Sequence, residues 1–166
     1  ASLAWVCSRS VSPLQHGFIR GRSLTDNILA VEAYAVYYTR YFAEPSGIML
    51  VDIAAAFPSL AHAYIFAVLE TMGFPRFFIE AIRMLYEDCE CCFVLNGFLG
   101  EGIRIESGIK QGCPASGSLF ALAFDPIIRY VCSKLPAGRF CLRVFADDVA
   151  MVARSLYVVL PIVVRA

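Results

Sequence analysis

The chain has 166 residues, of which 59% are hydrophobic and only 17% charged, and its formal net charge is zero. This composition excludes a disordered chain, which needs low hydrophobicity and high net charge, and it excludes a collagen-like or disulfide-scaffold protein. The length is that of about one domain. Mean hydropathy is high at +0.66, but no apolar run reaches the roughly 18 residues of a membrane span, so we expect no membrane partner.

Charge is distributed unevenly, with a net charge of +1 over residues 1–46, −4 over 47–100 and +3 over 101–166. That is not the basic stripe of a free-standing nucleic-acid-binding domain. The seven cysteines contain no C-x-x-C pair, and His16 and His62 are distant in sequence. We expect reduced thiols in an intracellular protein, and a structural zinc site is the less favoured alternative.

The expected elements alternate between helices and short strands. The run at 48–53 is apolar throughout, which is typical of a strand buried on both faces. The order predicts an α+β fold, in which an antiparallel sheet is backed by helices. In chain order we expect a helix from Ser23 or Thr25 to Ala43, a strand at 48–53, helices at 59–72 and 75–88, a hairpin of strands 91–95 and 102–106, a helix from 116 or 118 to 135, and a hairpin of strands 140–146 and 149–153.

Three acidic residues occupy positions where a charge is costly. Asp52 ends an apolar strand, and Asp147 and Asp148 interrupt two β-rich runs. Considered alone, the pair could be a solvated turn, and Asp52 could be an acid near a helix that begins at Pro58. Considered together, the ends of two strands could lie side by side in one sheet. Carboxylates that close repel one another unless they are protonated or bridged by cations such as Mg²⁺, so the three acids suggest a site for two metal ions and phosphoryl transfer.

Four motifs, in order, resemble those of reverse transcriptases of the non-LTR (LINE-type) retrotransposon class. The resemblance covers the chain from about Leu14 to about Ala153. It rests on Q-H-G-F-I-R-G-R-S at 15–23 followed by Asp26-Asn27, on the segment 50–60 around Asp52 and Phe57, on G-I-K-Q-G-C-P-A-S at 108–116, and on F-A-D-D at 145–148.

The resemblance implies a polymerase palm at 47–166 and part of the fingers at 1–46, forming a single structural unit without a thumb. It implies RNA-directed DNA synthesis from dNTPs on an RNA template and a DNA primer, using two Mg²⁺ ions, with Mn²⁺ as a possible substitute. Asp52 and Asp147 would be the principal metal ligands, and Asp148 would be a weaker or supporting one. The protein would contribute positioning and charge neutralisation.

The resemblance also implies five substrate-binding residues. Phe57 would exclude a ribose 2′-hydroxyl, although its alternative role is that of a core aromatic. Gln111 and Gly112 would approach a base pair, and the alternative is an ordinary turn. Lys110 would meet phosphate, or be a solvated lysine. Arg22 would contact the template backbone, and the alternative is an ion pair with Asp26 four residues on.

The chain also departs from the family. Pro58 stands where the family usually has Asp, which puts substrate affinity in question but not the metal site. The resemblance implies a fingers hairpin before Gln15 and a thumb after Ala166, so we expect poor polymerisation by this chain alone and a longer polyprotein, located in the nucleus or cytoplasm. Two alternatives are an RNA-templated RNA polymerase palm, against which Ala146 and Phe57 argue, and a catalytically inactive retrotransposon remnant.

Overall fold

The computed structural model describes residues 2–165 and has the mixed α+β architecture that the sequence predicts. Its contacts divide the chain into two compact units, one made of residues up to 54 together with those from 117 onward, and the other of residues 55–116. The predicted division into a partial fingers region at 1–46 and a palm at 47–166 within one structural unit stays a prediction. The predicted boundary after residue 46 separates the N-terminal segment from the sheet, whereas the first compact unit holds that segment and the sheet strands together.

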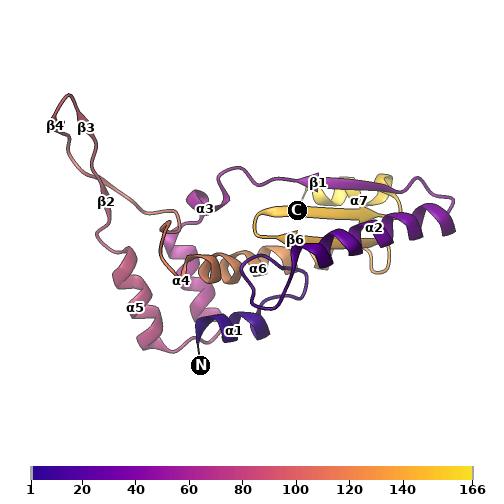
Figure 1. Ribbon diagram of the computed structural model, residues 1–166, viewed down its shortest axis with the longest axis horizontal. Coiled ribbons are helices and arrows are strands. Elements are labelled where there is room, and N and C mark those ends of the chain that lie inside the picture. The colour runs from indigo at the N-terminus through magenta and orange to yellow at the C-terminus, as the bar shows by residue number, and fades with distance from the viewer. Residues whose placement is uncertain (1, 166) are drawn as a thin grey trace. The chain divides into compact units, whose positions relative to one another are not determined.

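The first unit is built on a three-stranded antiparallel sheet with the strand order β1-β7-β6 (Figure 1). The central strand β7 pairs with both neighbours, so Val149 lies opposite Val51 of β1 and Val144 of β6. The strands are β1 (Gly47–Val51), β6 (Phe140–Phe145) and β7 (Asp148–Ala153), and the helices are α1 (Leu3–Ser10), α2 (Leu24–Tyr41), α6 (Ser116–Lys134, mostly in this unit) and α7 (Leu156–Val163).

The core of the first unit is formed mainly by α6 and by the two C-terminal strands. Residues 119–123 of α6 are almost completely buried, as are Val144 of β6 and Val152 of β7. A second cluster joins α2 to the sheet, where Tyr38 packs with Cys141 and Val152. The C-terminal half of the chain therefore holds most of the apolar packing of this unit.

The strand β1 differs from its prediction. We expected a strand buried on both faces, but Ile48 and Leu50 are exposed, the latter at 76% of its surface. The reason is that β1 is an edge strand whose open face carries these side chains. An apolar run does not distinguish a doubly covered strand from an edge strand whose exposed face is also apolar.

The second unit contains α3 (Ala56–Ser59), α4 (His62–Thr71), α5 (Arg76–Tyr86) and a hairpin that continues in two steps. Strand β2 (Glu90–Cys91) pairs with β5 (Ile103–Arg104), and β3 (Val94–Leu95) pairs with β4 (Phe98–Leu99) beyond them (Figure 1). The tip is an Asn96-Gly97 turn in which both residues have positive φ, as a tight hairpin requires. The turn is therefore tighter than the six-residue connection that the sequence suggested.

Several predicted elements are confirmed almost residue for residue. The Ser23 side chain accepts a hydrogen bond from the Thr25 N–H and caps α2, and Gly73 ends α4 with a left-handed φ of 76°. Three helices, α1, α3 and α7, were not predicted as separate elements, because each has at most eight residues. Within residues 2–165, no helix is both long enough and apolar enough to cross a membrane.

Candidate active site

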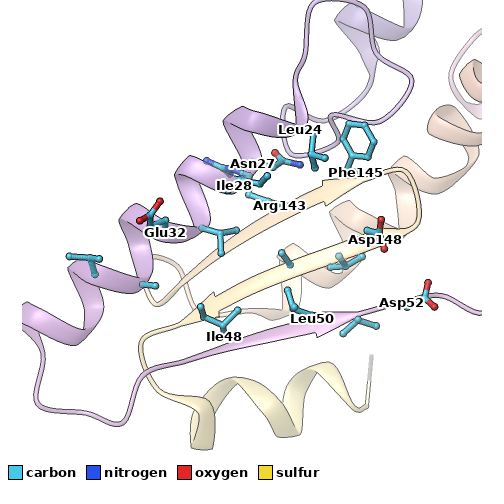
Figure 2. Close-up of a pocket in the computed structure, with 16 residues that line it drawn as sticks. Leu24, Asn27, Ile28, Glu32, Ile48, Leu50, Asp52, Arg143, Phe145 and Asp148 are labelled. Carbon is cyan, nitrogen blue, oxygen red and sulfur yellow. The ribbon is translucent and has the colours of Figure 1, made fainter.

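Two of the three predicted acids lie at the same end of neighbouring strands. In the β1–β7 ladder Val51 is opposite Val149, so the next position on each strand brings Asp52 level with Asp148. Both residues line one pocket, and Figure 2 shows them at one edge of the sheet. Side chains at directly opposed positions point to the same face. The strand ends that carry Asp52 and Asp148 therefore lie side by side in one sheet, as the sequence suggested for Asp52 and the acid pair. That these acids bind metal stays a prediction.

Asp147 lies in the turn and not in a strand. The β6–β7 hairpin closes at the pair Phe145–Asp148, which leaves Ala146 and Asp147 as the connecting residues. Asp147 is half-buried, whereas Asp52 and Asp148 are exposed. Ala146 has a φ of 58°, in the left-handed region that residues other than glycine rarely adopt. The backbone at Ala146 therefore determines how both acids of the turn are presented.

The three acids do not close into one cluster. Among residues 2–165, no group of three or more His, Cys, Asp or Glu side chains is placed to hold a metal ion. The joint binding of a metal ion by Asp52, Asp147 and Asp148 therefore stays a prediction, and the described residues offer the zinc alternative no ligand cluster. The structure supplies one pair of carboxylates on a sheet face and a third in the adjoining turn.

Two or three exposed carboxylates are a suitable set of protein ligands for Mg²⁺, which rarely has all of its ligands supplied by protein side chains. Mg²⁺ keeps several waters and is usually held by one or two carboxylates together with substrate phosphates. Exposed carboxylates on neighbouring strands leave room for those additional oxygens. The same pair repels itself electrostatically when no cation lies between the two groups. The residues present therefore fit a divalent cation that arrives with a phosphate-bearing substrate.

A large apolar pocket adjoins the acids. Its volume is about 700 Å³, and it lies between α2 and the sheet, with Ile28 on the helix and Leu50 on β1 among its lining residues (Figure 2). Asn27 helps to hold the helix there, because its Nδ2 donates to the Val144 carbonyl oxygen at 2.9 Å. Arg143 lines the same pocket and is the only basic residue among its lining side chains.

The Arg22 side chain binds the protein's own backbone. Its guanidinium donates to four backbone carbonyls, with Nη1 2.5 Å from both Ser12 O and Gln15 O. Nη2 lies 3.2 Å from Ser8 O and 3.1 Å from Val11 O. Burial lowers the pKa of Arg22, while the carboxylate of Asp125 acts in the opposite direction. The ion pair with Asp26 is absent from the described residues; contact with a template remains a prediction.

The remaining predicted residues all lie in the second unit, where two distant segments are held together. The Ile109 N–H donates to the Phe57 carbonyl oxygen at 3.0 Å, and the Gly108 N–H donates to Leu60 O at 2.8 Å. Gly108 has a φ of 97°, and a Cβ there would lie 3.3 Å from the Pro58 Cα. The motif around Phe57 therefore packs against the loop that leads to Gln111.

The loop residues themselves are open to solvent. Lys110, Gln111 and Gly112 are exposed, and the Lys110 Nζ lies 5.8 Å from the centre of the Tyr86 ring. The Ser116 hydroxyl donates to the Lys110 carbonyl oxygen. Phe57 is half-buried. That degree of burial is compatible both with a side chain that contacts the sugar and with an aromatic residue of the core. Their contacts with substrate remain predictions.

Sequence reasoning missed the structural role of two buried polar residues. His62 hydrogen-bonds Gly108 O through Nε2 at 2.9 Å and packs edge-on against Tyr86, so it fixes the base of the loop. Gln15 is completely buried and bonds the backbone of Ala146. The motif that contains Gln15 was recognised, but no sequence signal indicated which segment it would meet.

The whole described chain matches a known protein family. The family model described as "Reverse transcriptase (RNA-dependent DNA polymerase)" matches residues 1–165. A transposon TX1 protein of 149 kDa from Xenopus laevis is 28% identical over 162 residues, covering 91% of this chain and 12% of that protein. The Pol polyprotein of the type-2 retrotransposable element R2DM from Drosophila melanogaster is 30% identical over 147 residues, covering 86% of this chain and 14% of the relative.

Solved structures agree in fold. Apo telomerase from Candida tropicalis, truncated from its C-terminal domain, aligns with a TM-score of 0.69 at 13% identity, covering 98% of this chain and 34% of that one. Telomerase from Candida albicans, in complex with a fragment of telomeric RNA, aligns with a TM-score of 0.67 at 14% identity, covering 94% of this chain and 30% of that one. At these identities the likeness concerns the fold.

Proposed function

The chain belongs to the reverse transcriptase family, and on that premise we propose that it is the catalytic part of an RNA-directed DNA polymerase of a non-LTR retrotransposon. The observation that carries the proposal is the placement of Asp52 level with Asp148 at the edge of the β1–β7 ladder. A polymerase needs carboxylates at such an edge, open enough to receive a triphosphate.

In the proposed reaction, the primer 3′-hydroxyl attacks the α-phosphorus of a dNTP, and pyrophosphate leaves. Asp52 and Asp147 would be the principal ligands of two Mg²⁺ ions, and Asp148 would support them. When bound, the ions would neutralise phosphate charge and stabilise the attacking and leaving oxygens. The protein's own part is to hold the carboxylates in place, which β1 and β7 do through their ladder.

The second unit would supply selection of substrate. Phe57 would limit the sugar to a deoxyribose, while Lys110, Gln111 and Gly112 would approach the phosphate and the base pair. The support for this is local: the hydrogen bond from Ile109 to Phe57 keeps both segments together. Exposure of the loop leaves its polar groups available to a nucleic acid.

The partners proposed are an RNA template, a DNA primer and a dNTP. The chain spans 12%, 14% and 22% of the lengths of the curated relatives it matches. We therefore propose that a longer protein, located in the nucleus or cytoplasm, carries the full polymerase activity. The 166-residue chain alone should polymerise DNA poorly.

The test is calorimetric titration of Mn²⁺ in the presence of dTTP, followed by single-nucleotide extension of a DNA primer on an RNA template. We expect binding by the parent chain that is lost in Asp52→Asn and weakened in Asp147→Asn more than in Asp148→Asn. Extension should be slow and should favour dTTP over UTP. Absence of Mn²⁺ binding in the parent would favour an inactive remnant, and preference for UTP would favour an RNA polymerase.

A further inference from the structure

A single buried glutamine hydrogen-bonds the backbone of the turn that carries two of the acids. The Gln15 Oε1 accepts hydrogen bonds from the Ala146 N–H at 2.9 Å and from the Gly17 N–H at 2.7 Å. Its Nε2 donates to the Ala146 carbonyl oxygen at 2.9 Å, across 131 residues of sequence. One carboxamide thus satisfies both backbone groups of Ala146, and its side chain is completely buried.

These hydrogen bonds stabilise Ala146, the residue of the turn with an unfavourable backbone conformation. Ala146 has a left-handed φ of 58°, which alanine adopts only when its surroundings hold it there. Asp147 follows directly, and Asp148 begins β7. A change of backbone conformation at Ala146 would therefore redirect both carboxylates.

The segment around Gln15 is itself fixed to the sheet. The Val144 N–H donates to Leu14 O at 3.0 Å, and the His16 N–H donates to Val144 O at 2.8 Å, so residues 14–16 run beside β6 as a short parallel bridge. At Gly17, an added Cβ would lie 2.7 Å from the Ala146 Cα, closer than real contacts allow. Glycine is therefore required for this approach.

The three hydrogen bonds require a side chain that both donates and accepts hydrogen bonds. A neutral carboxamide has two N–H donors and an acceptor oxygen. An ionised glutamate could accept from the two N–H groups, but it could not donate to the Ala146 carbonyl. It would also place a negative charge beside two aspartates. Methionine has nearly the same length and makes none of the three bonds.

We propose that Gln15 is a positioning residue for the metal site: it holds the turn at Ala146 so that Asp147 and Asp148 are presented beside Asp52. The proposal rests on the proposed function, because it assigns a purpose to the same carboxylates. Gln15 itself touches neither substrate nor ion; it acts through the backbone of Ala146.

The first experiment is Mn²⁺ titration of Gln15→Met and Gln15→Glu at a temperature where each variant remains folded. Loss of a group that orients metal ligands weakens metal binding by about 10- to 100-fold, and we expect at least tenfold weaker binding in Gln15→Met. Val159→Ala is the matched control, because Val159 is buried in α7 and its truncation destabilises the same unit away from the turn. We expect the control to lower the melting temperature and to keep the affinity of the parent.

The second experiment needs no variant. In amide hydrogen exchange of the parent chain without metal, the Ala146 amide should be protected as strongly as the amides of the β6–β7 ladder. Exchange as fast as that of an exposed loop amide would overturn the proposal even if Gln15→Met fails to fold.

The outcomes separate the two proposals. If Asp52→Asn loses Mn²⁺ and folded Gln15→Met keeps it, the role of Gln15 is refuted while the metal site stands. If the parent binds no Mn²⁺, the metal site and the positioning role both fall. Weaker binding in Gln15→Met together with Gln15→Glu, and normal binding in Val159→Ala, would establish the role.

Discussion

Replacing Arg22 by methionine distinguishes a role of Arg22 in stability from a role in binding the template. In the structure, the Arg22 guanidinium ties the C-terminal end of α1 to the loop that precedes Gln15, through carbonyls of Ser8, Val11, Ser12 and Gln15. Arg22→Met keeps much of the aliphatic length and removes every one of these donors. If the structural role is right, the variant should lose stability whether or not nucleic acid is present.

The magnitude follows from the bonds. A hydrogen bond involving a charged group contributes about 1.5–3 kcal/mol net. Water can replace part of the loss because Arg22 is only half-buried, so we count the two shortest bonds at the lower end and expect about 3 kcal/mol. For a chain of this size each kcal/mol lowers the melting temperature by roughly 2–4 °C, which gives about 6–12 °C. Arg22→Lys should lose about half as much, because an ammonium cannot span four carbonyls.

Fluorescence of Trp5 during thermal or urea unfolding is the assay, because it is the only tryptophan and it lies in α1. Asp26→Asn is the control and should leave the unfolding midpoint unchanged, since Asp26 makes no ion pair in the described chain. An unchanged midpoint in Arg22→Met, combined with weaker binding of an RNA–DNA duplex, would refute the structural role and support the template contact.

Three further predictions concern the same unit. Gly17→Ala should be at least as destabilising as Arg22→Lys in urea unfolding, because its Cβ would meet the Ala146 backbone; a neutral result would contradict the close approach. Asp125→Ala should cost about 1–3 kcal/mol, since it leaves the Ser12 N–H without its buried acceptor while the exposed Arg129 is solvated, and a neutral result would argue against that hydrogen bond. Burial raises the pKa of the Cys141 thiol above its ordinary value of 9.0, so its contribution to stability is fully present below about pH 9 and is lost as pH rises through the raised value; melting temperatures that increase above pH 9 would contradict this.

Local signals predicted the elements well where the sequence carries caps and breakers. Ser23 starts α2, Gly73 ends α4, and the β-rich runs on either side of Asp147 form the β6–β7 hairpin. The meeting of Asp52 with this hairpin also followed, because two strands that each end in an acid are expected to share a sheet edge. Short elements such as α1 and α7 lack enough turns to show a period.

The sequence could not reveal which backbone groups the buried polar side chains would satisfy. Gln15 bonds a residue 131 positions away, and Arg22 bonds carbonyls up to 14 positions away. Such pairings depend on the three-dimensional approach of loops and carry no periodicity. The exposure of Leu50 was missed for a related reason, since an apolar strand does not record whether its outer face is covered.

The central claim is that Asp52 and the β6–β7 turn together hold a divalent cation. Anomalous diffraction from crystals of this chain soaked in Mn²⁺ and dTTP tests it most directly. The account predicts an anomalous peak within coordinating distance of the Asp52 carboxylate and of at least one of Asp147 and Asp148. Crystals that bind Mn²⁺ elsewhere, or nowhere, at a concentration that saturates the nucleotide, would contradict it.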